Sequence, residues 1–430
     1  MTAAKTLRVL FINDTSRDGG PGRSLHVLLR HLDRQRVHRT VLLPRPGPVA
    51  DLLRSDGAAD EIVFEDAWIE NIVAPLSRPM ERSDHLAPLA TRALRAAGNA
   101  IKGARLLHRL AARARGYDLV YGNGTTANFL AAGAAIRAGV PALWHVRYTD
   151  VPRVAAALHR GLARSATVRR IVCVSRPSVA LFPGMEGKVE VVNNALDLDA
   201  FTPGASTPRL RQELGWGPDT VIFASAGRIL RRKGYDEMIR AARFMLNDLS
   251  MEERQRCGFA IIGDTPPDFA EDHRAECVAL AEQLGIGDRV RFLGFRSDVR
   301  PYIGDADVVV VPSVYPDPLP RAVIEGMALG KPIVAFGVGG IGEMLDDGVE
   351  GALVRGTPPD IEALAAAMLR CFREPGRRRA QGEAARARVL RDFDGRRHGA
   401  RIERLIHEAA APQTHAASAG NRSNPAEIPT

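Results

Sequence analysis

Two acidic residues, Asp317 and Glu325, stand eight positions apart in the second half of this 430-residue sequence. An apolar run over residues 307–311 ends at Pro312, which predicts a buried strand that finishes just before them. Eight residues is a little over two helical turns, so both carboxylates can face one cleft if the loop leads directly into a helix. Carboxylates accept hydrogen bonds from hydroxyl groups in pairs, so the pattern predicts a site for sugar hydroxyls. The alternative is two exposed acids that the dipole of a helix N-terminus favours.

Positive charges follow another predicted strand, in the loop 227–234, which reads Gly-Arg-Ile-Leu-Arg-Arg-Lys-Gly. A strand, a glycine-containing loop and a helix form a good anion site, because backbone N–H groups and the helix dipole add to the side-chain charges. The two spaced cations of this loop, Arg228 and Lys233, could therefore bind an anion such as a phosphate group. We expect Arg231 and Arg232, which lie between them, to form a solvated basic turn.

A third loop contains Gly19 and Gly20 and follows a predicted strand over residues 7–13. Apolar residues then fall at i, i+3, i+4 and i+7 from Leu25, which predicts one face of a helix. The loop lacks the usual dinucleotide-binding fingerprint, so an ordinary turn between a strand and a helix is the alternative to a binding loop.

Taken together, these motifs resemble those of the retaining glycosyltransferases of family 4, also called glycosyl transferases group 1. That family has the GT-B fold, in which two Rossmann-like α/β domains with doubly wound parallel sheets face each other across a cleft. Its acidic motif is Glu, seven residues, Glu, so Asp317 keeps the spacing but is one methylene shorter. The resemblance implies that Asp317 faces the donor sugar, Glu325 holds the ribose of the nucleotide, and Arg228 and Lys233 bind the donor diphosphate.

The resemblance extends over roughly residues 5–400 and implies roles for further positions. Gly19 and Gly20 would lie over the cleft, close to the donor phosphates and the acceptor. Gly339 and Gly340 would offer backbone N–H groups to the same phosphates.

The family's active-site histidine is replaced in this sequence. It should stand eight residues after Gly139, where this chain has Arg147, while His145 lies two residues earlier. On a strand these two side chains share one face, so either could point into the cleft as a catalytic group. His145 could instead make a structural hydrogen bond. Arg147 could meet an anionic acceptor or the diphosphate, because arginine makes bidentate contacts.

Predicted strands and helices alternate along the whole chain, which is typical of parallel, doubly wound sheets. We expect an acceptor-binding N-terminal domain over residues 1–201 and a nucleotide-sugar-binding C-terminal domain over residues 208–384. A helix at about 385–410 should pack back on the first domain, and residues 411–430 should form a disordered tail. The predicted strands cover residues 7–13, 40–44, 118–122, 142–146, 171–175, 189–193, 221–225, 259–263, 290–294, 307–311, 333–336 and 351–354.

Composition bears on compartment and ligands. The four cysteines have neither paired nor metal-ligand spacing, which is typical of reduced core residues. Arg8 interrupts the first apolar run, and no run approaches the roughly 20 apolar residues that a membrane span needs. We therefore expect a cytoplasmic protein. No Asp-x-Asp element or tight grouping of ligands predicts a metal site, and we expect no cofactor beyond a nucleotide-diphosphate sugar as co-substrate.

The net charge of +9 is concentrated in one stretch, since residues 78–115 hold nine Arg or Lys against two acids. Leucines at helical spacing are interleaved there, which predicts a basic amphipathic helix that could lie on the anionic inner face of the plasma membrane. A solvated Arg-rich helix face is the alternative. No known binding module accompanies the charge, so nucleic acid is not an expected partner.

The sequence thus predicts a metal-independent glycosyltransferase that acts with retention on a glycan or a lipid-linked acceptor. A degenerate GT-B protein that serves as a binding or assembly subunit is an alternative, which the departures at Asp317 and Arg147 favour. A nucleotide-sugar epimerase is a further alternative, although no acid and base pair can be placed for it.

Overall fold

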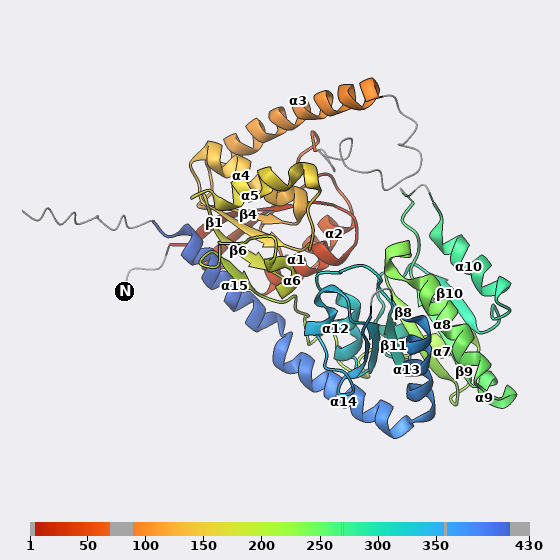
Figure 1. The fold of residues 1–430 in the computed structure, drawn as a ribbon. Helices are drawn as coiled ribbons and strands as arrows, with labels where there is room; N and C mark the ends of the chain where they lie inside the picture. Colours follow the sequence, from red (N-terminus) through yellow and green to blue (C-terminus); the bar gives the residue numbers. More distant parts are fainter. Residues whose placement is uncertain (1–4, 69–88, 268, 270, 357–358, 413–430) are drawn as a thin grey trace, which may run out of the picture.

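The computed structural model describes residues 5–68, 89–267, 269, 271–356 and 359–412, and its strands form two separate sheets (Figure 1). The first sheet has seven strands in the order β3-β2-β1-β4-β5-β6-β7, and the second has six in the order β10-β9-β8-β11-β12-β13. The strands are β1 Leu7–Asn13, β2 Val37–Leu43, β3 Glu61–Phe64, β4 Leu119–Asn123, β5 Ala142–Val146, β6 Val168–Cys173, β7 Val189–Val191, β8 Val221–Ala226, β9 Cys257–Ile262, β10 Val290–Gly294, β11 Val308–Val311, β12 Ile333–Phe336 and β13 Gly351–Val354.

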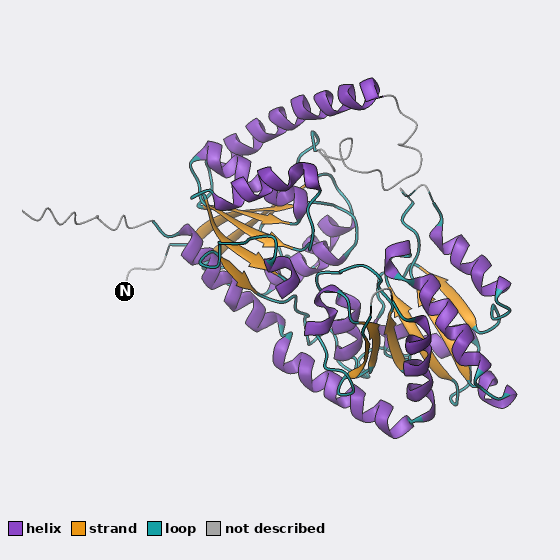
Figure 2. Ribbon diagram, in the orientation of Figure 1, coloured by secondary structure: helices purple, strands orange, loops and turns teal. Residues whose placement is uncertain are grey.

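All neighbouring strands within these sheets run parallel, and helices cover both faces of each sheet (Figure 2). The two-domain Rossmann-like fold class predicted from the sequence is therefore confirmed. The helices are α1 Gly20–Arg30, α2 Pro48–Ser55, α3 Leu89–Ala114, α4 Thr125–Ala138, α5 Arg153–Arg164, α6 Arg176–Val179, α7 Leu210–Leu214, α8 Tyr235–Asn247, α9 Met251–Gln255, α10 His273–Gln283, α11 Arg300–Ile303, α12 Arg321–Ala328, α13 Ile361–Arg373, α14 Pro375–Asp392 and α15 Gly395–Ala410, with 3₁₀ turns η2 Arg231–Lys233 and η3 Gly339–Glu343.

Strand β11 shows why the pattern of apolar residues predicts these sheets. Its four consecutive valines are all buried, and they contribute in alternation to the two apolar cores on opposite faces of the second sheet. A strand buried on both faces reads as a continuous apolar run, and β-branched side chains suit the extended backbone. The first sheet is likewise covered by one apolar core on each face.

The order of the strands decides where a ligand site can form. In the first sheet the chain fills one side of β1 with β2 and β3 and then crosses to β4 on the other side. The second sheet repeats this reversal, with β9 and β10 on one side of β8 and β11 on the other. A crevice opens at the carboxyl ends of strands where the winding reverses. The loops that follow β1, β8 and β11, which carry the predicted site residues, therefore lie at these crevices.

The end of the described chain returns to the first domain as two helices rather than one. Helix α14 lies along the second domain, and α15 packs against α1 of the first domain (Figure 1). The helices are separated at Phe393 and Asp394, and the Asp394 side chain accepts a hydrogen bond from the N–H of Arg396 at the start of α15. The sequence pattern had predicted a single helical segment, because a capped break of this kind changes the apolar spacing very little.

His398 of α15 leads to a prediction about pH. Burial lowers the pKa of His398 to about 3, and the positive charge of Arg147 acts in the same direction. Between pH 6.5 and 3 the unfolded chain then binds a proton that the folded chain does not, so the free energy of unfolding falls as the pH falls. From pH 6.5 to 5 we expect this histidine to account for up to about 2 kcal/mol of that loss.

Urea denaturation at pH 7.5, 6.5 and 5 measures this effect. The His398→Gln variant should lose less stability than the wild type on acidification, and His108→Gln, which changes an exposed histidine, should follow the wild type. The same pH dependence in all three proteins would show that His398 is not responsible.

In the first domain, one strand was not predicted, and one helix lies in the predicted basic segment. Strand β3 was not predicted, because it is a short, partly exposed edge strand with a weak pattern. Helix α3 lies in the predicted basic segment, and Leu106 and Leu110 are buried while Ile101 is 59% exposed. Residues 78–88 of that segment, and residues 413–430 of the predicted tail, fall outside the described residues. No helix in the described part of the chain is long and apolar enough to cross a bilayer.

Candidate functional site

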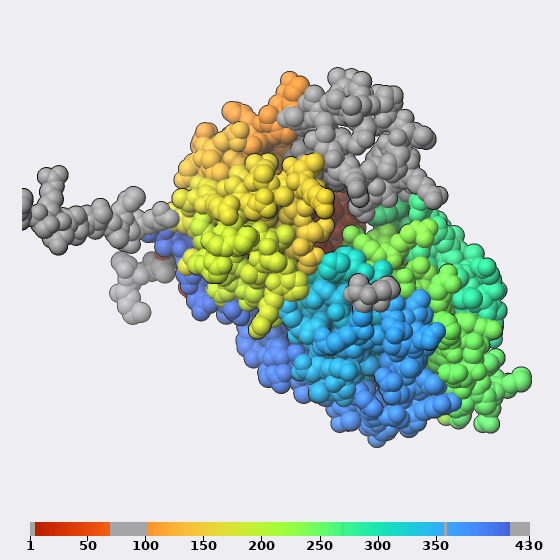
Figure 3. All heavy atoms as spheres, in the orientation of Figure 1, coloured from red at the N-terminus to blue at the C-terminus, as the bar shows by residue number. Residues whose placement is uncertain are grey.

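A cavity of about 850 Å³ lies between the two domains, and both domains line it. Figure 3 shows the domains meeting along a seam, with red atoms from the start of the chain visible at the bottom of the gap. The predicted residues that line the cavity are Gly19, Gly20, Arg147, Arg228, Lys233, Asp317 and Glu325. The cavity thus brings together side chains that are up to 306 positions apart in the sequence, from Gly19 to Glu325.

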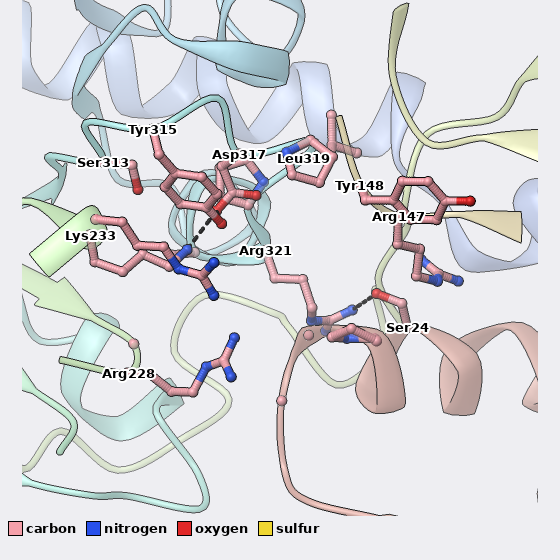
Figure 4. Close-up of a pocket in the computed structure, with 18 of the residues that line it drawn as sticks. Ser24, Arg147, Tyr148, Arg228, Lys233, Ser313, Tyr315, Asp317, Leu319 and Arg321 are labelled. Atoms are coloured by element: carbon pink, nitrogen blue, oxygen red, sulfur yellow. Dashed lines mark hydrogen bonds and ion pairs between the residues drawn. The ribbon is translucent and has the colours of Figure 1, made fainter. Parts of the chain in front are cut away.

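The acidic loop and the cationic loop meet inside this cavity (Figure 4). The Nζ atom of Lys233 lies 2.5 Å from Oδ2 of Asp317, and the hydroxyl of Tyr315 donates to the same oxygen at 2.9 Å. Asp317 is only 6% exposed, so the ion pair is shielded from solvent and strengthened by that shielding. Tyr315 adds an aromatic surface, because its ring centroid lies 5.3 Å from Nζ of Lys233. The two motifs found separately in the sequence therefore form one site.

The basic turn between the two predicted cations agrees with the prediction at Arg231 and differs from it at Arg232. Arg231 is exposed and forms ion pairs with Glu271 and Glu276, as a solvated residue should. Arg232 instead lines the cavity, with its guanidinium 4.9 Å from the Tyr315 ring centroid and its Nε buried without a hydrogen-bond partner. The prediction for Arg232 was wrong, because successive residues of a 3₁₀ turn point in directions about 120° apart. Arg228 also extends into the cavity (Figure 4).

Glu325 lies in α12 and is 8% exposed, and its partner Arg321 was not found from the sequence. Arg321 donates from Nε to Glu325 Oε1 at 3.0 Å and from Nη1 to Ser24 Oγ of α1 at 3.3 Å. It therefore links the acidic helix of the second domain to the first domain across the cavity. The spacing of four residues between an arginine and a following glutamate on one helix was the available signal.

Of the two candidates at the end of β5, Arg147 lines the cavity and His145 does not. His145 is completely buried, and its Nδ1 accepts hydrogen bonds from the Tyr121 hydroxyl at 2.5 Å and from Nη2 of Arg147 at 3.3 Å. Burial, and then the charge of Arg147, lower the pKa of His145 well below its usual value. His145 can therefore influence a ligand in the cavity only through Arg147, as a structural hydrogen-bond partner.

The loop with Gly19 and Gly20 is held across the cleft. Arg23, just inside α1, donates to Asp18 at 2.7 Å and to the carbonyl oxygen of Ser297 in the second domain at 2.9 Å. A side chain at Gly19 would meet nothing within 4 Å, so its environment is open. The two glycines therefore leave room for a ligand at this edge of the cavity.

Gly339 and Gly340 lie behind the acidic loop and do not line the cavity. The N–H of Gly340 donates to the carbonyl oxygen of Asp317 at 2.9 Å, so it is already bonded within the protein. A Cβ at Gly339 would lie 2.3 Å from that same oxygen, and φ of Gly339 is +57°. The sequence had predicted that these two glycines offer N–H groups to the cavity. In this structure they instead support the position of Asp317.

Gly234 gives a test of how tightly the cationic loop is packed. Its φ is +73°, and an added Cβ would lie 1.9 Å from the carbonyl oxygen of Pro312, just before the acidic loop. Gly234→Ala should therefore destabilise the protein by more than about 2 kcal/mol, because left-handed strain of about 1–2 kcal/mol is joined by a clash. Gly215→Ala is the matched control, because φ is +66° there and no atom lies within 4 Å.

Urea denaturation compares these two glycine variants with the wild type. The control should lose about 1 kcal/mol, from left-handed strain alone. Equal losses in both variants would show that the cationic and acidic loops are not packed as closely as the structure indicates.

Two solved structures of other proteins have the same overall fold. HepE of Anabaena, solved with UDP and glucose, has a TM-score of 0.74 and 23% identity over 93% of this chain and 99% of its own. Sucrose-phosphate synthase of Thermosynechococcus elongatus has a TM-score of 0.72 and 19% identity over 94% of this chain and 98% of its own. The chain therefore has the GT-B fold of glycosyltransferases.

The sequence of the second domain matches a particular family. Residues 206–388 match the family model of the glycosyl transferases group 1, and the chain carries a domain of that family. The D-inositol 3-phosphate glycosyltransferase of Kribbella flavida is 36% identical over 211 residues, which are 48% of each chain. A Mycobacterium sp. protein of the same name is 36% identical over 180 residues, 41% of this chain and 38% of its own. The match thus spans about half the length of these curated relatives or less.

Among the described residues, no group of three or more His, Cys, Asp or Glu side chains is gathered as metal ligands would be. Independence from metal stays a prediction.

Proposed function

We propose that the protein is a retaining glycosyltransferase that moves a sugar from a nucleoside-diphosphate sugar to a hydroxyl group of a glycan or lipid-linked acceptor. The observation that carries this proposal is the Lys233–Asp317 pair, which joins a cationic loop and an acidic loop in one cavity with Arg228 and Glu325. The names of similar proteins support it, since HepE was solved with UDP-glucose and the Kribbella relative is a glycosyltransferase.

The donor would lie against the second domain. Arg228 and Lys233 would contact the diphosphate, and Arg232 offers a further unsatisfied N–H to the same anion. Glu325 would accept hydrogen bonds from the ribose hydroxyls, which is a task that a buried carboxylate performs well. Asp317 would hold Lys233 in place and accept from a hydroxyl of the sugar.

In the proposed reaction, the bond between the sugar C1 and the β-phosphate oxygen breaks while the acceptor oxygen bonds to C1 on the same face. The acceptor's proton passes to the leaving phosphate oxygen, so no protein nucleophile is required. The protein positions both substrates and stabilises the negative charge that develops on the leaving group. Arg321 and the Arg23 contact to Ser297 would help by keeping the two domains closed around the donor.

The acceptor side of the cavity favours a partner with an apolar part. Val154 and Leu158 lie one turn apart on α5, line the cavity and are 57% and 60% exposed. Exposed apolar side chains that line a cavity are suited to the hydrocarbon or the apolar face of a ligand. They support a lipid-linked acceptor and, with the basic helix α3, a cytoplasmic enzyme that works at the membrane surface.

Nucleotide binding tests the proposal against its alternatives. Calorimetry without added metal should show that one of UDP, GDP and ADP binds the wild type in the micromolar range and does not bind the Arg228→Ala, Lys233→Ala double variant. Slow hydrolysis of the corresponding sugar nucleotide would exclude a non-catalytic subunit, and an unchanged sugar stereochemistry would exclude an epimerase. If none of the three nucleotides bound, the donor site and the proposal would both be wrong.

A further inference from the structure

We propose that Arg147 binds an anionic group, a phosphate or a carboxylate, that belongs to the acceptor. The inference rests on the proposed function and names the chemical class of the second substrate. It concerns the side of the cavity formed by the first domain, opposite the cations that face the donor diphosphate (Figure 4).

Arg147 is a half-buried cation whose hydrogen-bond partners in the protein are all neutral. Its Nε donates to Oδ1 of Asn123 at 2.6 Å, Nη1 donates to Oδ1 of Asn194, and Nη2 contacts His145 Nδ1 at 3.3 Å. The described residues place no carboxylate in ion-pair contact with it. Even partial burial of a charge without a counterion is costly, and such a charge is commonly retained where a ligand supplies the opposite charge.

The neutral partners also hold the guanidinium in one orientation. The amide nitrogen of Asn123 donates to Oδ1 of Asn13 at 2.6 Å, so the amide oxygen of Asn123 must face Arg147. The amide nitrogen of Asn194 donates to the carbonyl oxygen of Leu319 at 3.3 Å, so its oxygen must face Arg147 as well. His145, which the Tyr121 hydroxyl also contacts, completes the support. A guanidinium fixed in this way is preorganised to bind an anion.

A second cation strengthens the case. Arg321 lies on the other side of Ser24 in Figure 4, lines the same cavity and is close enough to disfavour the charged form of Arg147. Of these two guanidinium groups, only Arg321 has an acid partner, Glu325. Glu325 is also the residue proposed for the ribose, so the pair lacks one negative charge. An anion between the two arginines would supply that charge and accept bidentate hydrogen bonds.

The position of Arg147 favours the acceptor as the source of this anion. Arg147 follows β5 of the first domain, whereas Arg228 and Lys233 follow β8 of the second domain, and Asp317 is already paired with Lys233. The contact between Asn194 and Leu319 brings Arg147 next to the loop that carries Asp317, where the acceptor hydroxyl must approach the sugar. The donor diphosphate is the other possible source, and the experiment below separates the two.

The test compares matched charged and neutral polyols as probes. Calorimetry in the presence of the nucleotide that binds best would use D-inositol 3-phosphate against inositol, and glucuronate against glucose. We expect one anionic probe to bind the wild type at least tenfold more tightly than its neutral partner. In Arg147→Gln this preference should disappear, while the affinity for the nucleotide alone stays within twofold.

Two further variants keep the outcome clear. Arg147→Lys retains the charge and should keep part of the preference for the anionic probe. Its thermal unfolding midpoint should show that it folds. Arg153→Gln removes an exposed arginine on α5 and should behave as the wild type. If neither anion were preferred by the wild type, or if Arg147→Gln lost nucleotide affinity tenfold and kept the anion preference, the proposal would be overturned. Absence of nucleotide binding by the wild type would instead contradict the proposed function.

Discussion

The Lys233→Ala variant is expected to lose about 100- to 1,000-fold in kcat, which corresponds to roughly 2.7–4 kcal/mol of transition-state stabilisation. Lys233 places a positive charge where the β-phosphate oxygen would leave, and its Nζ is already oriented by Asp317 at 2.5 Å. The substitution also leaves Asp317 buried without a cation, and the negative charge of Asp317 would repel the phosphate. Arg228→Ala should show a loss of the same order, because it removes the second cation of the site.

The rate of sugar release from the preferred nucleotide sugar measures this loss under saturating donor. Arg231→Ala is the matched control, since it removes a cation from the same loop whose ion pairs with Glu271 and Glu276 lie away from the cavity. It should retain the wild-type rate. An unchanged kcat in Lys233→Ala would contradict the assignment of the leaving-group site, and a large loss in Arg231→Ala would show a nonspecific effect of charge.

The Glu325→Ala variant is expected to bind the donor nucleotide about 10- to 150-fold more weakly, because a hydrogen bond to a charged group contributes roughly 1.5–3 kcal/mol. Glu325 is 8% exposed and would accept from the ribose hydroxyls through its second oxygen, since Oε1 already accepts from Arg321 at 3.0 Å. The loss should appear in the dissociation constant of the nucleoside diphosphate itself, in the absence of any sugar.

A double-mutant cycle with a 2′,3′-dideoxy nucleotide makes this prediction specific to the ribose. The wild type and Glu325→Ala should bind the dideoxy analogue equally weakly, because the contact is already missing. Glu362→Ala, at an exposed position of α13, should bind both nucleotides as the wild type does. Full additivity of the two losses would show that Glu325 does not contact the ribose.

Most strands could be predicted because their signal is local. Eleven of the predicted strands coincide with or overlap β1 and β4–β13. The twelfth, at 40–44, overlaps β2. Strand β3 was missed, because an edge strand of four partly exposed residues lacks a continuous apolar run. The break between α14 and α15 was missed because α14 ends at Asp392 and Asp394 already caps α15, so the amphipathic pattern is barely interrupted.

The sequence by itself determined the chemistry that each loop can offer. The carboxylates at 317 and 325 and the cations at 228 and 233 were recognisable because a strand, a loop and a helix are local, and residue spacing within them predicts direction. Only the tertiary structure decided which side chains share a cavity. No local pattern encodes the contacts that build the site. They are the ion pair of Lys233 with Asp317, the hydrogen bond of Arg147 to His145, and the hydrogen bond of Arg321 to Ser24.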